Sequence, residues 1–444
     1  MARGFSGIAW PRTLFVHRPW WAHGVEASPA ALDRFGEPIH EVPPGPPRIC
    51  GIHGRRTLAT MRFLHTADWH LGRIFGGFDM LPIQQHALDG LVAIARQTGP
   101  QAIVVAGDVY DRAVPPEDAV HLLDDVLARL AELAPVLLIA GNHDSGRRLE
   151  FGRGFLRGAG VHVAGTAGTG VTRVDLGDDH GVVAFHLLPY ATPEEARYGL
   201  GRDDLRSHDD ATRARVATCE LSGTSRHVLV GHMFVQGGQE TKDSERDISV
   251  GGIATVDPGV FGGFAYTALG HLHRPHSIGN GRIRYSGSLA PYSFSEEDHA
   301  KGVSVVEIDA AGGVLVEEIR LPQKHGMRTL RGTIEELCAA ALQDDRRDHD
   351  LVRVLATDLV LPPGSSETLR KLYPHLLEFG RDRPSEQPAK GAAGDPEPQP
   401  PPRSEREFLE SFLSSRYPNA VDAAVLDFAR ECLEQAIRRQ GGEA

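Results

Sequence analysis

Five short apolar runs in this chain each end in histidine, aspartate or asparagine, and this repetition constrains the fold more than any other feature. The runs are "RFLHTADWH", "AIVVAGDVYD", "PVLLIAGNHD", "HVLVGH" and "YTALGHLH". Continuous runs of β-branched and aliphatic residues are typical of strands buried on both faces of a sheet. Between them, residues 82–99 and 115–133 carry apolar residues at helical spacing. Alternating strands and helices predict an α/β core.

Polar residues follow each predicted strand at its carboxyl end, where open α/β sheets bind their ligands. A single pair could be a turn or a helix cap, because Asp and Asn favour both, or, for histidines, a surface turn. Five such ends in one chain are hard to explain in that way. The spacing of His271 and His273 also puts both imidazoles on one face of a strand. The candidate set comprises Asp68, His70, Asp108, Asp111, Asn142, His143, Asp144, His232, His271 and His273.

The mixture of carboxylate, imidazole and amide side chains suits manganese, iron or zinc. The set is too large for one four-coordinate ion. It fits two ions about 3.5–4 Å apart, the arrangement of two-metal phosphoesterases. One carboxylate must then bridge the ions, and Asp108, on the middle strand, is the natural candidate.

Composition sets outer limits on the class of protein. The chain has 444 residues, 41% of them hydrophobic and 24% charged, which is ordinary for a globular protein of two or three domains. Its four cysteines lie far apart, which argues against a disulfide framework and favours a reducing, cytoplasmic location. No apolar run is long enough to span a membrane. The net charge of −12 argues against a protein that coats DNA, but not against an enzyme that grips nucleic acid locally.

Changes in sequence character predict the domain organisation. Residues 1–60 are aperiodic and rich in proline, so we expect a disordered extension or a mis-assigned start before Met61, with a leader as the less favoured alternative. Later, a low-complexity stretch rich in Pro and Gly indicates a flexible linker, and a helical pattern follows it. The predicted units are a catalytic domain at 61–320, a small α/β unit at 321–382, the linker at 383–405 and helices at 406–444.

Taken in order, the motifs D-x-H, G-D-x-x-D, G-N-H-D, G-H and G-H-x-H make residues 61–300 resemble the calcineurin-like metallophosphoesterases. The phrases "GDVYDRAVPP", "ERDISVGG" and "YSGSLAPYSFSE" are similar to the SbcD family, the nuclease subunits of bacterial SbcC–SbcD complexes. This resemblance implies an αββα sandwich with a small α/β capping domain and a C-terminal helical tail.

The same resemblance implies an activity and partners. It predicts a manganese-dependent DNA nuclease of repair, recombination and replication, an exonuclease on double-stranded ends and an endonuclease on single strands or hairpins. It implies that the C-terminal helices bind a coiled-coil SbcC-type ATPase, and that the chain is a homodimer within a heterotetramer. The alternative that the tail folds back on its own domain stays open.

Carried over by motif, the resemblance divides the candidate residues between two metal ions. The first ion would be held by Asp68, His70, Asp108 and His273, and the second by Asp108, Asn142, His232 and His271. His143 would face the scissile phosphate, stabilise charge and help to protonate the leaving oxygen, and Asp144 would orient it. Arg73, Arg112, Arg147, Arg148 and Arg274 follow the motifs and are candidates for phosphate contacts or for solvated loop residues.

Two other functions compete with a nuclease. A small-molecule or cyclic-nucleotide phosphodiesterase would use the same fold and ligands. A scaffold protein with a degenerate metal site is the other alternative, and the complete ligand series argues against it. Residues 293–302 are either a loop at the rim of the site or a plain surface turn.

Overall fold

The computed structural model describes residues 60–167, 170–241 and 255–382, together with Leu409, Val425, Leu426, Phe428, Ala429 and Arg430. Its first sheet has six strands in the order β14-β13-β1-β4-β5-β6. The parallel part consists of β1 (Met61–Thr66), β4 (Ala102–Ala106), β5 (Val136–Ile139) and β6 (Val161–Ala164). Antiparallel strands β13 (Gly302–Ile308) and β14 (Val314–Arg320) extend it beyond β1.

A second six-stranded sheet has the order β11-β12-β10-β9-β8-β7. Its central strands are parallel, namely β8 (Gly181–Leu188), β9 (His227–His232), β10 (Tyr266–Gly270) and β12 (Ile283–Tyr285). Antiparallel strands β7 (Thr172–Asp178) and β11 (His276–Ile278) close its two edges. The order places β9 and β10, which carry two of the five predicted motifs, side by side.

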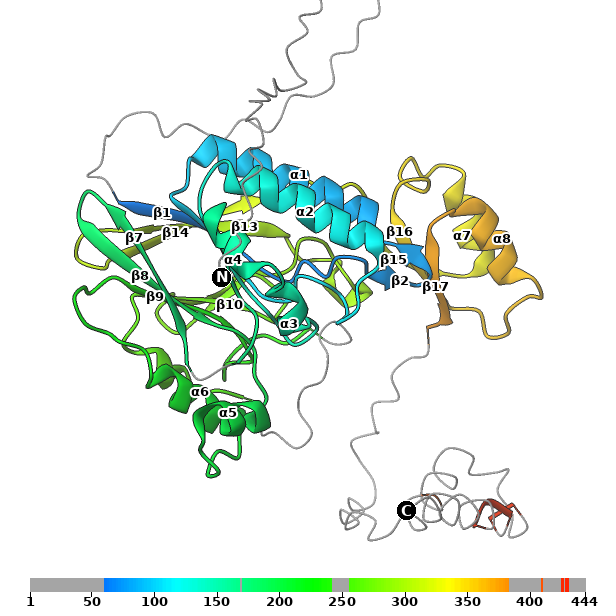
Figure 1. The fold of residues 1–444 in the computed structure, drawn as a ribbon. Coiled ribbons are helices and arrows are strands. Elements are labelled where there is room, and N and C mark those ends of the chain that lie inside the picture. The colour runs from blue at the N-terminus through cyan, green and yellow to red at the C-terminus, as the bar shows by residue number, and fades with distance from the viewer. Residues whose placement is uncertain are drawn as a thin grey trace, which may run out of the picture. The chain divides into compact units, whose positions relative to one another are not determined.

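The two sheets pack face to face through a shared hydrophobic cluster. Phe63 of β1 makes an edge contact with Phe185 of β8, with ring centroids 5.3 Å apart. Helices α1 (Leu81–Thr98) and α2 (Glu117–Ala131) bury their apolar stripes on the outer face of the first sheet (Figure 1). The shorter helices are α3 (Gly146–Leu149), α4 (Arg153–Gly158), α5 (Pro193–Leu200) and α6 (His208–Val216). The predicted αββα sandwich is confirmed.

A separate three-stranded parallel sheet follows in the chain, with the order β15-β16-β17. It consists of β15 (Met327–Gly332), β16 (Leu351–Ala356) and β17 (Leu376–Arg381), with α7 (Ile334–Ala341) and α8 (Ser365–Leu372) packed on it. This unit has its own hydrophobic cluster. We refer to residues 327–381 as the cap.

Several predicted segments fall beyond the part of the chain that the structure describes. Residues 1–59 and the linker lie outside it, as do the C-terminal helices apart from the six single residues named above. Among the described residues, no helix combines the length and the apolarity that crossing a bilayer requires.

Candidate metal centre

The five motifs meet where the carboxyl ends of β1, β4 and β5 approach those of β9 and β10. Close packing brings the two sheets together there. A Cβ atom added to Gly270, the last residue of β10, would lie 2.1 Å from the carbonyl oxygen of Ala106 on β4. Because only glycine fits at this distance, the chain can place polar groups from both sheets around one point.

Backbone strain is concentrated in the same place. Among the described residues, only four residues other than glycine have a positive φ: Asp68 (52°), His70 (46°), Asp108 (49°) and His271 (104°). All four are predicted metal ligands. Such conformations are costly for residues with side chains, and they cluster at active sites where the surrounding structure enforces them. Hydrogen bonds from the Asp68 amide to Gly107 (3.0 Å) and from the His70 amide to Asp108 (2.9 Å) hold this backbone.

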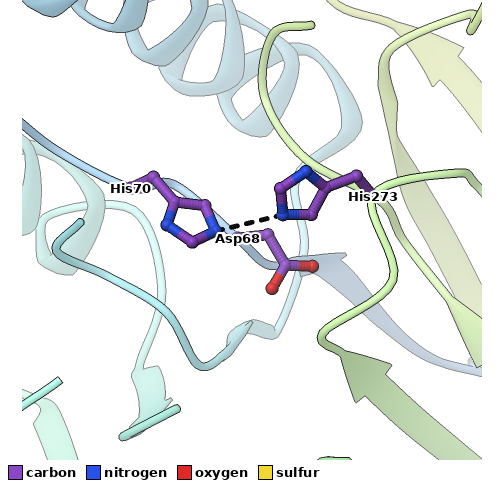
Figure 2. A group of neighbouring side chains, drawn as sticks. All are labelled: Asp68, His70 and His273. Carbon is purple, nitrogen blue, oxygen red and sulfur yellow. Dashed lines mark hydrogen bonds between the residues drawn. The ribbon is translucent and has the colours of Figure 1, made fainter. Parts of the chain in front are cut away.

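Asp68, His70 and His273 form the first group of side chains (Figure 2). The Nε2 atoms of His70 and His273 are 3.1 Å apart, and both residues are buried. Two nitrogen ligands that each lie about 2.1 Å from one ion have a separation of roughly this size. Asp68 accepts a hydrogen bond of 2.9 Å from the His271 amide, which orients its carboxylate.

Asn142, His232 and His271 form the adjoining group. The Oδ1 atom of Asn142 lies 2.8 Å from Nε2 of His232 and 3.2 Å from Nδ1 of His271. Asp108 lies between the two groups, because its Oδ2 is 3.6 Å from His70 Nε2 and 3.4 Å from His232 Nε2. The structure thus brings all seven predicted ligands together, with Asp108 between the two groups. Their role as ligands stays a prediction.

The orientations of the His271 and His273 side chains differ from those expected for residues i and i+2 of a strand. His271 and His273 do not aim at one point: His273 contacts His70, whereas His271 contacts Asn142. The reason is the positive φ of His271, which breaks the alternation of a strand immediately after β10 ends at Gly270.

Protonation states of three of the four histidines in this cluster favour cation binding. Burial lowers the pKa of His70 and of His273, and lowers that of His271 well below its usual range, so these rings are neutral at pH 7. Burial also opposes the charged form of His232, but the Asp108 and Asp68 carboxylates outweigh it and raise the pKa of His232 to about 9. A divalent ion would therefore displace a proton from His232 when it binds.

Three of the histidines are fixed through Nδ1, which leaves Nε2 to face the centre. His232 Nδ1 donates to the carbonyl of Ala106 (2.9 Å), and His143 Nδ1 donates to the carbonyl of Asp111 (2.8 Å). His273 Nδ1 lies 3.0 Å from a carboxylate oxygen of Glu296. Carbonyl and carboxylate partners of this kind fix ring orientation in metal sites. The residues present fit divalent metal ions.

Comparison with known proteins agrees with this geometry. Residues 61–275 match the family model described as calcineurin-like phosphoesterase. This part of the chain is similar to calcineurin-like phosphoesterases. That family indicates a hydrolase of phosphate esters that uses divalent metal ions. A solved structure, that of TT1561 from Thermus thermophilus, is 13% identical over 59% of this chain and 100% of that chain, with a TM-score of 0.34.

Sequence reasoning missed two charged residues of the phosphoesterase domain that stand behind His273. Glu296 and Lys301 are both buried and form an ion pair. Lys301 Nζ also donates to the carbonyl of His273 (2.9 Å) and to Ser288 Oγ (2.9 Å). The interpretation of residues 293–302 as a plain surface turn is therefore wrong for this pair. The only sign of this ion pair in the sequence was the presence of an acidic and a basic residue in one loop.

Asp144 contributes to the centre through the main chain. Its carboxylate accepts hydrogen bonds from the amides of Val109 (3.0 Å), Tyr110 (2.9 Å) and Gly141 (2.9 Å). It thereby ties together the loops that follow β4 and β5. Since the first of these loops carries the Asp111 carbonyl that holds His143, Asp144 orients His143 through that loop.

Gly141 offers a direct test of the packing around Asp108. A Cβ atom added to it would lie 2.2 Å from Asp108 Oδ1 and 2.3 Å from the Asp108 amide. We expect Gly141→Ala to push the Asp108 carboxylate out of place and to lower both Mn²⁺ affinity and kcat/KM by a factor of about 100, the upper end of what loss of a ligand's support costs. Calorimetric Mn²⁺ titration and hydrolysis of a p-nitrophenyl phosphodiester would measure the two effects. Gly154→Ala, where an added Cβ meets nothing within 4 Å, is the matched control. Unchanged metal affinity in Gly141→Ala would contradict the prediction.

Proposed function

We propose that the protein is a manganese-dependent two-metal DNA nuclease, acting on double-stranded ends and on single strands or hairpins together with an SbcC-type ATPase. The observation that carries the two-metal part is the position of Asp108 Oδ2, between His70 Nε2 at 3.6 Å and His232 Nε2 at 3.4 Å. Burial, which would raise the pKa of Asp108, is outweighed by His232 and His70, so the pKa lies well below its usual value. An ionised carboxylate that faces both groups of predicted ligands suits a bridge between two cations.

The proposed chemistry assigns distinct tasks to the residues of the centre. Divalent ions, when bound, would lower the pKa of a water and neutralise charge on the phosphate. Asp68, His70, Asp108 and His273 would hold one ion, and Asp108, Asn142, His232 and His271 would hold the other. His143 donates its Nδ1 proton to the Asp111 carbonyl, so only in its doubly protonated form would its Nε2 stabilise the phosphate oxygens and give its proton to the leaving oxygen.

The packing of the cap against a loop beside the candidate metal centre favours a polymeric substrate. Met327, Leu351 and Leu377 of the cap share a hydrophobic cluster with Tyr292 and Phe294. Tyr292 in turn makes edge contacts with two predicted ligands, at ring distances of 5.4 Å from His70 and 5.7 Å from His273. A second domain packed on the loop beside the centre provides surface for a substrate longer than a mononucleotide. The likeness of the sequence to the SbcD family supports DNA as that substrate.

The partner proposals rest on other parts of the chain. The helical pattern at 406–444 would bind the ATPase. A homodimer is supported by a groove of about 600 Å³ that includes Val120, Leu123 and Phe151, beside the exposed Phe155. Exposed apolar patches of this kind mark protein interfaces. Light scattering at micromolar concentration tests it, and a monomer would contradict the homodimer.

We would test the nuclease proposal with the purified full chain, Mn²⁺, end-labelled linear DNA and, in parallel, a small phosphodiester. The proposal predicts cleavage of DNA at a higher kcat/KM than that of the small ester. His143→Ala should lower kcat by about 10²–10⁴-fold, the range typical of a general acid. It should leave the Mn²⁺ affinity nearly unchanged, because His143 is not among the proposed ligands.

A small-molecule phosphodiesterase is the second candidate, and the net charge of −12 favours it. Hydrolysis of the small ester with DNA left intact, even after addition of an SbcC-type ATPase, would contradict the nuclease proposal and favour this candidate. Loss of metal binding in His143→Ala would instead show that His143 belongs to the ligand set.

A further inference from the structure

A groove of about 990 Å³ opens beside the candidate metal centre, and the proposed function does not account for it. Asn142 and Asp144 line it together with Arg147 of α3. Tyr190 and Tyr198, from the segment that follows β8 and enters α5, line it as well. We call this the α5 groove.

Backbone packing builds the floor of the α5 groove. Gly146 and Gly165 both line it, and a Cβ atom on either glycine would lie 2.0 Å from the carbonyl oxygen of the other. The start of α3 and the segment after β6 therefore approach each other here without a side chain between them.

Tyr190 is held firmly at the boundary between the groove and the metal centre. Its amide donates to the carbonyl of Ala140 (2.9 Å), and Arg215 Nη1 donates to the carbonyl of Pro189 (2.8 Å). The Tyr190 ring lies 6.4 Å from that of the predicted ligand His232, at an interplanar angle of 85°. Tyr190 therefore lines the groove and also contacts a predicted ligand of the metal centre.

Tyr198 stands on the other side of the groove and is 93% exposed. Its helix is fixed by a capping box, in which Thr192 and Glu195 bond each other's amides, and it ends at Gly201 in a left-handed conformation. A large aromatic side chain on a fixed helix, left in water beside a groove, is a surface on which a nucleobase can stack. Stacking of this kind accepts any base.

The two walls of the groove differ in charge. Arg147 lies on the wall shared with Asn142 and Asp144, and Glu194 and Glu195 lie on the α5 wall with Tyr198. Arg215, behind Pro189, is only 4% exposed, and its Nε and Nη2 have no hydrogen-bond partner in the described part of the chain. An anionic group is favoured beside Arg147 and the metal centre, whereas the two glutamates repel phosphate from the α5 wall. The part of the ligand that faces Tyr198 should be uncharged.

We infer that the α5 groove binds the nucleoside next to the scissile phosphate, with its base on Tyr198 and Tyr190 and its phosphate towards Arg147 and the metal centre. This inference rests on the proposed phosphodiesterase chemistry and names the part of the substrate that the site recognises. It holds for a nucleotide in DNA and for a free nucleotide ester alike. The test below separates these sources.

The first readout is a ratio of two rates measured on the full chain with Mn²⁺. One substrate is thymidine 5′-phosphate p-nitrophenyl ester, and the other is methyl p-nitrophenyl phosphate, which has the same leaving group but no base. We expect the wild type to prefer the nucleoside ester. Tyr198→Leu should lower the ratio of the two kcat/KM values about tenfold, mainly through KM, because base–aromatic stacking is typically worth this factor or more. Tyr198→Phe should keep the ratio, and Leu315→Ala, which alters an exposed apolar residue of β14, should leave both rates unchanged.

The second readout needs no catalysis. A trinucleotide that contains 2-aminopurine should lose fluorescence when it binds the wild type or Tyr198→Phe, and retain it with Tyr198→Leu. Equal ratios in all Tyr198 variants, together with unchanged quenching in Tyr198→Leu, would overturn the inference. Preference for the nucleoside ester with DNA left intact would support the α5 groove and contradict the nuclease proposal, whereas DNA cleavage with no effect of Tyr198→Leu would do the reverse.

Discussion

Asp108→Asn is expected to lower phosphodiester hydrolysis by about a thousandfold or more and to abolish tight binding of one Mn²⁺ equivalent. Asp108 lies between the two groups of ligands, with Oδ2 at 3.6 Å from His70 Nε2 and 3.4 Å from His232 Nε2. An amide can offer one oxygen to a cation but cannot bridge two with negative charge. Divalent ions supply several kcal/mol of transition-state stabilisation, and each 1.36 kcal/mol corresponds to a factor of ten in rate.

Asparagine is the right replacement because it separates the loss of charge from damage to the fold. Asp108 has a φ of 49°, a conformation that asparagine tolerates better than alanine does. Asp108 Oδ1 also accepts a hydrogen bond of 2.9 Å from the His143 amide, and the Oδ1 of asparagine can keep it. Mn²⁺ stoichiometry by titration, hydrolysis rate and thermal midpoint in EDTA would be compared with those of the wild type. Two bound Mn²⁺ with wild-type activity in Asp108→Asn would exclude a bridging role.

The sequence predicted the central strands and the long helices because their pattern follows directly from burial. The run at 102–106 is buried throughout in β4, and the helical stripe at 82–99 is the buried face of α1. The antiparallel edge strands were not predicted. In β7, "TRVDLGD", only one residue is buried, so the run reads as a loop, and only its pairing with β8 makes it a strand.

The candidate ligands could be picked out because their types and positions after each strand are local features of the sequence. The directions of their side chains could not, since Asp68, His70, Asp108 and His271 leave the geometry of a strand through positive φ angles. The sequence also did not predict the residues that hold His273 in place. Glu296 stands in a polar loop, and nothing local in "SFSEEDHAKG" distinguishes a buried carboxylate from a solvated one.

Lys301→Met is expected to destabilise the metal-free protein by about 3–5 kcal/mol, the usual cost of breaking a buried ion pair by removing one partner. Lys301 is 3% exposed and Glu296 is fully buried, so the variant leaves a carboxylate in the interior without this counter-ion. The Glu296 carboxylate would keep its contacts with His273 Nδ1 at 3.0 Å and Ser288 Oγ at 3.4 Å. Neither group replaces the lost charge, because the hydroxyl is neutral and burial lowers the pKa of His273. Urea unfolding in EDTA would measure the loss.

The double variant Glu296→Gln with Lys301→Met shows whether the cost comes from the broken ion pair or from lost packing. It should recover at least half of the lost stability, because a neutral amide can keep the contact with His273 and donate to Ser288, and because replacing a buried ion pair by neutral groups is often close to neutral. Arg202→Met removes one partner of the exposed pair with Asp204 and should have no measurable effect, as expected for solvated pairs. If the double variant were as unstable as Lys301→Met, the methylene packing of Lys301 would be the cause. If the double variant regained stability but bound Mn²⁺ more weakly, the charge of Glu296 would be needed to hold His273 as a metal ligand.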